Sequence, residues 1–305
     1  MDNVASDHPR FRYLIFGWTV LSELECPELE MSSGVPELFF RFGAVPGNLP
    51  FGKIESLAGE AAPGLFLLKI RDTVSFLIRD GREVVMDLAP GSCSDAVRLF
   101  LLGPVLGILL HQRSFLPIHG SAILSEGAAV IFAGPTGSGK STLAAAFFRR
   151  GYSVIADEIC ALDTSRKPEV VPAPPYLSLW ADALTGLEIG FSDLRPVRSD
   201  LRKFLMPAGG VRGGSRVPLG SCYIIECSNH PGEITLQRME GMPKIEALAM
   251  QTYRRSFIDA LDLTSSNFEQ ICKISVSTRV VLVRRPRGEF TADRLADAIE
   301  KDLVA

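Results

Sequence analysis

The sequence predicts a mixed α/β protein with a smaller β-rich N-terminal domain (1–92) and a larger C-terminal domain (93–305) that has a mixed sheet flanked by helices. Three observations predict this class. Before residue 90, short aromatic and β-branched runs alternate with Gly, Pro and acidic turns, as in strands. After residue 117, a strand, a glycine-rich loop, a helix and another strand follow in close succession. Helical periodicity then recurs between further strand-like runs.

The composition is that of a globular chain. It has 305 residues, of which 47% are hydrophobic and 22% are charged, far from disordered or fibrous proteins. A net charge of -3 gives no support for nucleic acid as the main partner. The N-terminus MDNVASDHPRFRY lacks the apolar core of a signal peptide, so we expect a cytoplasmic protein.

Cysteines and histidines show no metal-binding or disulfide pattern. The six cysteines are far apart, and none forms a C-x-x-C pair. The four histidines also lack the spacing of metal ligands. We therefore expect reduced thiols and no structural metal.

The first ninety residues carry strand signals but no recognisable chemistry. The strand-like runs are FRYLIFGWTV, ELFFRFG, GLFLLKI, VSFLIRD and EVVMDL. Strand pairing alone says nothing about activity, so a docking or scaffold role is the default interpretation.

Residues 94–113 form the most hydrophobic stretch, SDAVRLFLLGPVLGILLHQR. Its unbroken apolar run contains Gly103, Pro104 and Gly107 and is too short to span a membrane. The sequence predicts a buried helix that is kinked near Pro104 and joins the two domains.

A hairpin is predicted next, with strands at 117–124 and 128–134 and a turn centred near Glu126. The second strand runs directly into the glycine-rich loop. The helix TLAAAFFRR follows and ends at Gly151, and the strand YSVIA then ends at Asp157 and Glu158.

The rest of the chain continues the mixed pattern. Strands are predicted at 216–227 and 277–286, and helices at 244–261, 266–274 and 291–303. Two polar or Gly-rich segments, 192–200 and 207–216, are predicted to be mobile loops. The glycines of the second would allow it to close over a bound ligand.

The segment GPTGSGKS fits the motif G-x-x-x-x-G-K-[ST] in full, with a strand before it and a helix after it. Backbone N–H groups of such a loop converge on phosphate oxygens, and the helix start adds its dipole. Lys140 is expected to reach the β- and γ-phosphates, and the Ser141 hydroxyl to bind Mg²⁺. The predicted nucleotide-binding residues are Gly134, Pro135, Thr136, Gly137, Ser138, Gly139, Lys140, Ser141 and Thr142.

Asp157 and Glu158 are the first carboxylates downstream of the loop at a strand end. Two adjacent carboxylates permit a division of labour, in which one holds the metal and the other accepts a proton from an attacking hydroxyl. An ordinary exposed turn is the alternative interpretation. His119 is placed by the hairpin register opposite residue 133, beside the phosphates, although it could also be a hydrogen-bonded structural group.

These residues resemble the HPr kinase/phosphorylase family of bacterial serine kinases. The resemblance rests on His119-Gly120, the loop Gly134–Ser141, Arg150-Gly151 and Asp157-Glu158, in that order. It implies that Asp157 is the general base, that Ser141 and Glu158 serve Mg²⁺, that His119 supports the reacting phosphate, and that a serine hydroxyl is the acceptor.

The sequence departs from that family at two places. Glu158 stands where the family usually has Asp, and LEIGF keeps Glu188, a further candidate metal ligand, without the following Arg-Gly. These departures argue against bacterial HPr as the substrate and against phosphorylase activity.

The opening FRYLIFGWTVLSELECPEL, the run PLGSCYIIE and Lys203 instead look like the HPr-kinase-like proteins encoded beside ribosomally made peptides, including lasso-peptide precursor kinases. Lys203 is therefore a candidate catalytic residue, the foremost among the basic residues Arg198, Arg202, Lys203, Arg212 and Arg216.

The leading hypothesis is thus an ATP- and Mg²⁺-dependent kinase for a serine of a peptide or small protein. We expect no nucleic acid or membrane partner, and homo-oligomers are common in the family. Two alternatives stay open: a small-molecule kinase, and a nucleotide-binding sensor that hydrolyses ATP poorly and signals by binding a partner.

Overall fold

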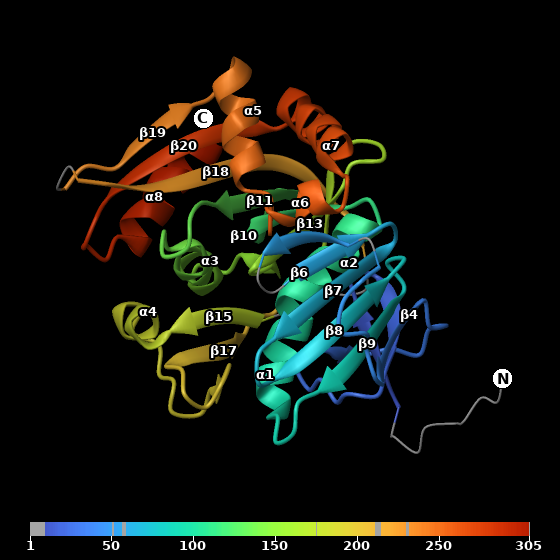
Figure 1. Ribbon diagram of the computed structural model, residues 1–305. Coiled ribbons are helices and arrows are strands. Elements are labelled where there is room, and N and C mark those ends of the chain that lie inside the picture. Colours follow the sequence, from blue (N-terminus) through green and yellow to red (C-terminus); the bar gives the residue numbers. More distant parts are fainter. Residues whose placement is uncertain are drawn as a thin grey trace.

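The computed structural model describes residues 10–50, 52–56, 59–174, 176–210, 215–229 and 232–304. Within them, two large mixed sheets and several helices lie together, which confirms the mixed α/β class (Figure 1). The first sheet comes from the N-terminal part of the chain and the second from the part after residue 115. A three-stranded sheet lies beside them.

The first sheet has nine strands in the order β3-β1-β2-β4-β9-β8-β7-β6-β5. Its strands are β1 (Phe11–Ile15), β2 (Trp18–Ser22), β3 (Glu30–Met31), β4 (Leu38–Phe42), β5 (Lys53–Ser56), β6 (Gly59–Ala62), β7 (Leu65–Ile70), β8 (Val74–Arg79) and β9 (Glu83–Leu88). Four of the five predicted strand runs each form one strand. The fifth, FRYLIFGWTV, is divided by a turn at Phe16 and Gly17 into the antiparallel pair β1 and β2. The sequence did not indicate β3, β5 and β6, because they are short and poor in aromatic and β-branched residues.

The predicted buried helix spans Ser94–Gln112 as α1 (Ser94–Phe100), the π-helical turn η1 (Leu101–Val105) and α2 (Leu106–Gln112). Pro104 lies inside the π-helical turn, so the irregularity predicted there is present. This helix is long and apolar enough to cross a membrane by composition, but 61% of that window is buried in the protein. It packs into the core of the first sheet.

The second sheet has eight strands. Seven of them follow the order β11-β10-β13-β14-β18-β20-β19, and the eighth, β12, pairs with β10 outside this order. Its strands are β10 (Leu116–Ser125), β11 (Ala128–Ala133), β12 (Ser153–Ala156), β13 (Ile159–Asp163), β14 (Glu169–Val171), β18 (Val217–Ser228), β19 (Thr235–Arg238) and β20 (Arg279–Pro286). Because β11, β18 and β20 are parallel, their carboxyl ends meet at one edge of the sheet. The glycine-rich loop begins at that edge.

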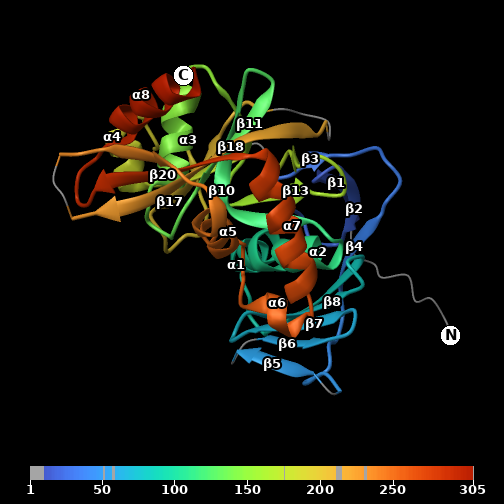
Figure 2. The same ribbon diagram turned by 90° about the horizontal axis from the view of Figure 1, so that it is seen from above.

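Helices cover both faces of this sheet (Figure 2). One face carries α3 (Lys140–Arg149) and α8 (Ala292–Leu303), whose apolar side chains share a core with β11 and β20. The other carries α5 (Gly241–Met250) and α7 (Thr264–Ser277). The two faces of the sheet are therefore both buried, as the apolar runs of β11, β18 and β20 require.

The helix predicted at 244–261 is wrong as a single element. α5 ends at Met250, and only Phe257–Ala260 is helical again, as α6. Between them the chain meets β10: Thr252 bridges to Ile118, and the Tyr253 N–H donates to the Pro117 carbonyl at 2.8 Å. These backbone bonds to a strand outweigh the helical periodicity of the segment.

The three-stranded sheet consists of β15 (Tyr176–Trp180), β17 (Lys203–Pro207) and β16 (Arg195–Pro196), and α4 (Ala181–Gly186) follows β15. Part of the segment predicted as a loop at 192–200 is thus a short strand. The loop predicted at 207–216 lies partly outside the described residues, so its closure stays a hypothesis.

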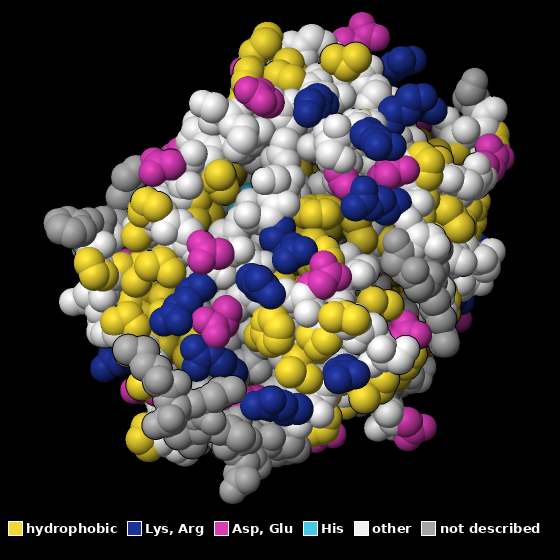
Figure 3. Space-filling view, turned by 90° about the vertical axis from the view of Figure 1, so that its right-hand side faces the viewer, with side chains coloured by type: hydrophobic (Ala, Val, Ile, Leu, Met, Phe, Trp, Pro, Cys, Tyr) yellow, Lys and Arg dark blue, Asp and Glu magenta, His cyan; other side chains and the backbone are white. Residues whose placement is uncertain are grey.

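The surface shown in Figure 3 carries Lys and Arg interspersed with Asp and Glu, with apolar side chains between them. All six cysteines are free. Among the described residues, no group of three or more His, Cys, Asp or Glu side chains could hold a metal ion. The boundary near residue 92 stays a prediction.

Candidate functional site

The predicted hairpin is present, but its register differs by one residue. Gly120 pairs with Ala133, so the expectation that His119 lies opposite residue 133 was wrong. Both turn residues, Glu126 (φ 48°) and Gly127 (φ 79°), have the positive φ of a type I′ turn. The turn is therefore centred between them rather than on Glu126.

The glycine-rich loop has the backbone that its motif demands. Gly134, Gly137 and Gly139 have φ values of 142°, 82° and 98°, which favour glycine. A Cβ atom on Gly134 would lie 2.4 Å from the Ile225 carbonyl oxygen of β18. The loop thus passes too close to the sheet for any side chain there.

Two polar side chains inside the loop indicate a phosphate cradle. The Lys140 ammonium donates to the carbonyls of Gly134 (2.9 Å) and Pro135 (3.1 Å), so it is held across the loop. The Ser138 hydroxyl is buried without a hydrogen-bond partner among the described residues. Helix α3 begins at Lys140, and its first N–H groups have no partner within the helix. Donors therefore gather where the motif places phosphate oxygens.

Asp157 lies at the end of β12 and contacts the loop directly. Its Oδ1 accepts hydrogen bonds from Ser141 Oγ (2.8 Å) and Ser121 Oγ (2.6 Å), and its Oδ2 accepts one from the Ser178 N–H (2.7 Å). Burial raises the pKa of Asp157, and the bonds from Ser121 and Ser178 oppose that rise. Since the Ser141 hydroxyl donates to Asp157, its oxygen lone pairs stay available for a metal ion.

Glu158 occupies an unusual backbone position. Its φ is 66°, and the Ile159 N–H donates to the Asp157 carbonyl at 2.8 Å, so Glu158 is the central residue of a γ-turn. Such a turn costs about 1–3 kcal/mol for a residue other than glycine. The turn aims adjacent carboxylates in different directions, and the Glu158 side chain is 43% exposed.

His119 is tied to this turn. Its Nδ1 lies 3.1 Å from the Glu158 carbonyl oxygen and 3.8 Å from Glu158 Oε1, so Nδ1–H can donate to that carbonyl. Burial and the nearby Lys140 lower the pKa of His119. The structure therefore brings His119, Lys140 and the acid pair together, with the imidazole favoured in its neutral form near pH 7.

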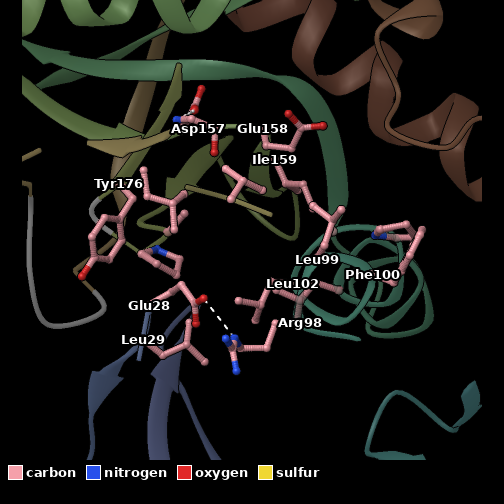
Figure 4. Close-up of a pocket in the computed structure, with 18 of the residues that line it drawn as sticks. Glu28, Leu29, Arg98, Leu99, Phe100, Leu102, Asp157, Glu158, Ile159 and Tyr176 are labelled. Atoms are coloured by element: carbon pink, nitrogen blue, oxygen red, sulfur yellow. Dashed lines mark hydrogen bonds and ion pairs between the residues drawn. The ribbon is translucent and has the colours of Figure 1, made fainter. Parts of the chain in front are cut away.

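Glu158 lines three neighbouring cavities. The phosphate-loop cavity, about 880 Å³, is bounded by loop residues from Thr136 to Thr142, α4 and residues 288–292. The α5 cavity, about 610 Å³, lies beside His119, Pro135 and α5. The helix cavity, about 350 Å³, lies between the acid pair and α1–η1 (Figure 4). These volumes span the usual range for small-ligand sites.

Lys203 also lies at this junction, at the start of β17. It lines both the phosphate-loop cavity and the helix cavity, and its ammonium is 5.9 Å from the centre of the Trp180 ring. Glu188, in contrast, is not brought to the metal-binding groups. It follows the end of α4 with a φ of 57°, is exposed, and lines none of these cavities.

The other predicted basic candidates divide similarly. Arg202 lines the phosphate-loop cavity. Arg198 pairs with Asp200, and Arg216 with Asp163, so each is held by its own carboxylate. Arg212 lies outside the described residues.

The sequence analysis missed Arg285 and Arg254. Arg285 Nε donates to the Ser138 carbonyl at 2.9 Å and lines the phosphate-loop cavity. It stands near the carboxyl end of β20, the edge at which parallel strands deliver their residues to the loop, so strand order could have indicated it. Arg254 has a φ of 52° and lines both the helix cavity and the α5 cavity. No pattern in the sequence marks it.

The chain is thus a mixed α/β protein in which a glycine-rich loop lies beside an acid pair. No family model matches the sequence, and no curated protein matches it either. A solved structure of the Hpr(Ser) kinase/phosphatase from Coxiella burnetii is similar, with a TM-score of 0.32 and 13% sequence identity over 62% of this chain and 93% of that chain.

Proposed function

We propose that this protein is an ATP- and Mg²⁺-dependent kinase that phosphorylates a serine hydroxyl on a peptide or small protein. The observation that carries the proposal is the position of Asp157. It contacts Ser141 of the phosphate loop and also lines the helix cavity, so one carboxylate is shared by a phosphate-binding side and a second, separate cavity. A kinase needs a catalytic side chain positioned between the bound phosphate donor and the hydroxyl of the acceptor.

The residues present fit ATP and Mg²⁺. The loop backbone, the buried hydroxyl of Ser138 and the ammonium of Lys140 supply donors for phosphate oxygens. Ser141 and Glu158 supply oxygen ligands of the kind that Mg²⁺ prefers. Bound ATP would supply the γ-phosphoryl group.

The protein's own side chains then divide the work. Asp157 accepts the proton of the attacking hydroxyl, since it faces the helix cavity. Lys140 and Lys203 line the phosphate-loop cavity and offset negative charge on the moving group. His119, neutral and hydrogen-bonded to the Glu158 carbonyl, holds the turn on which both acids stand.

Separate measurement of binding and chemistry tests the proposal. Lys140→Ala should abolish ATP binding, whereas Asp157→Asn should keep it and lose phosphoryl transfer by at least about a hundredfold. Intact-mass analysis of candidate acceptor peptides with ATP and Mg²⁺ gives the transfer, and titration with a fluorescent ATP analogue gives the binding. A glutamine at Glu158 should weaken the response to Mg²⁺.

The outcomes separate the alternatives. Binding of ATP with transfer only to a metabolite hydroxyl would indicate a small-molecule kinase. If the Asp157→Asn variant still signals fully by binding its partner and the Lys140→Ala variant does not, the protein is a nucleotide-binding sensor. On sequence grounds alone, we further propose that the acceptor is a lasso-peptide precursor and that the protein is cytoplasmic. On the same grounds, the proposal includes a homo-oligomer and no nucleic-acid or membrane partner.

A further inference from the structure

The helix cavity is built jointly by the two parts of the chain. The N-terminal region contributes Phe16, Glu28 and Leu29, and the joining helix contributes residues 98–106. The second sheet and the three-stranded sheet contribute the acid pair, Ile159 and residues from 173 to 205. Figure 4 shows side chains from these parts converging on one space. The N-terminal region therefore reaches this cavity through the turn after β1 and the segment before β3.

The two ends of this cavity are polar and the wall between them is apolar. Asp157 and Glu158 stand at one end, and Glu28 and Arg98 at the other (Figure 4). The apolar wall of the joining helix comprises Leu99, Phe100, Leu102, Pro104 and Leu106. An occupant would thus meet carboxylates at one end and hydrocarbon along the joining helix. The lining also includes the cations Lys203 and Arg254.

The far end is already neutralised. Arg98 donates to Glu28 Oε1 at 3.1 Å, to the Glu25 carbonyl at 3.3 Å and to Asp95. Arg195 lies 3.4 Å from Glu28 and 3.2 Å from Asp95. Because two guanidinium groups face two carboxylates, this end offers no unpaired cation for a phosphate or carboxylate of an occupant. Glu28 Oε2 is buried and has no hydrogen-bond partner among the described residues.

We propose that the helix cavity is the acceptor site, and that it takes a large apolar side chain adjacent to the serine that is phosphorylated. The inference rests on the proposed kinase function and names its substrate class. The serine hydroxyl lies at the acid pair, where Asp157 receives its proton. The serine oxygen forms the new bond to the γ-phosphorus of ATP, and the bond from that phosphorus to the β–γ bridging oxygen breaks to release ADP. The neighbouring side chain fills the space against Leu99 and Leu102.

The size and chemistry of the cavity favour a peptide segment. A cavity of about 350 Å³ admits a side chain or two but not a folded domain. A peptide side chain gains affinity when its hydrocarbon is buried against the apolar wall, and this wall needs no hydrogen-bond donors along its length. The N-terminal region therefore sets acceptor specificity, because its residues Phe16, Glu28 and Leu29 close this cavity.

A panel of short peptides tests the inference. The peptides are acetyl-Gly-Gly-X-Ser-Gly-Gly and acetyl-Gly-Gly-Ser-X-Gly-Gly, with X as Gly, Leu or Phe. Transfer from ATP is measured by intact mass. Binding of fluorescein-labelled versions with Ala in place of Ser is measured by anisotropy with ADP and Mg²⁺. In one of the two peptide series, with X either before or after the serine position, the peptides with Leu or Phe at X should bind at least about tenfold more tightly than the peptide with Gly at X.

Variants that fill the cavity make the test specific. Leu99→Trp and Leu102→Trp should each remove most of the preference for Leu and Phe without changing the affinity for ATP. The matched control is Leu88→Trp, at an exposed position of β9 that lines none of the three cavities. If a tryptophan variant does not fold, Leu99→Ala serves instead and should raise the preference for Phe over Leu.

The outcomes distinguish this inference from the kinase proposal. Binding with the apolar preference but without transfer supports the cavity as a peptide site and overturns the kinase. Transfer without the preference, or a preference that survives both tryptophan variants, overturns the cavity assignment while the kinase stands. Failure of every peptide to bind, or transfer only to a small hydroxylated molecule, also overturns it.

Discussion

Gly134 shows how a single residue can depend on both the loop and the sheet. Its φ of 142° suits glycine, and the nearest obstacle to a side chain is the Ile225 carbonyl of β18. The motif in the sequence explains the first requirement, since tight phosphate loops need flexible residues. Only the packing of β11 beside β18 creates the second.

We therefore expect Gly134→Ala to destabilise the protein by at least about 2 kcal/mol, because a backbone oxygen cannot move away cheaply. The measurement is the free energy of unfolding in urea. Gly137→Ala is the matched control: its φ of 82° is also positive, but nothing lies within 4 Å of its Cβ. It should cost only about 1 kcal/mol. Equal losses in the two variants would contradict the clash.

At the scale of elements, the joining helix and the segment after α5 meet at one contact. Tyr253 is buried against Gly107 of α2, and a Cβ there would lie 2.6 Å from the Tyr253 ring. The Tyr253 carbonyl accepts a hydrogen bond from His111 Nε2–H at 3.0 Å, and the Gln251 carbonyl accepts one from the His119 N–H at 2.8 Å. Helix α2 is thus linked to the candidate site.

Gly107→Ala should lower the free energy of unfolding by about 1–2 kcal/mol, because overpacking outweighs the gain in helix propensity. Gly103→Ala is the control, since its Cβ would meet the Tyr253 hydroxyl at an ordinary 3.5 Å. It should be neutral or stabilise by up to about 1 kcal/mol. Chemical denaturation measures both variants. A Gly107→Ala protein as stable as Gly103→Ala would show that Tyr253 shifts freely.

For the whole molecule, the hydrophobic core of the first sheet continues into the second part of the chain. The same cluster contains Phe66 of β7 together with Phe257 of α6 and Ile159 of β13. The Phe66 and Phe257 rings lie 4.8 Å apart. Because the parts share a core, they should unfold together.

Phe257→Ala tests this coupling in a Trp180→Phe background, where Trp18 alone reports on the first sheet. Loss of the buried ring should cost about 3–5 kcal/mol. Trp18 fluorescence and far-ultraviolet circular dichroism should shift to lower urea concentration together. Phe268→Ala, at a position 52% exposed on α7, should cost less than about 0.5 kcal/mol. Separate transitions for the two signals would contradict a shared core.

Strand pattern predicted much of the fold because alternating apolar residues report directly on burial. The prediction was right for four of the five strand runs of the first sheet and for the strand, loop and helix around Gly134, but it did not divide FRYLIFGWTV into β1 and β2. It failed for 244–261, where helical periodicity continues although the backbone bonds to β10. It also misplaced the register of His119 by one residue, because the turn type was not considered.

The glycine-rich loop, the helix that follows it and the acid pair at the next strand end were all predictable from the sequence, because they depend on local residue types and spacing. The structure was needed to show that Arg285 and Lys203 line the phosphate-loop cavity, that Lys203 and Arg254 line the helix cavity, and that Glu188 lines neither. It was also needed to show that the N-terminal region closes a cavity beside Asp157. Those outcomes depend on how distant segments pack, and no local pattern encodes that packing.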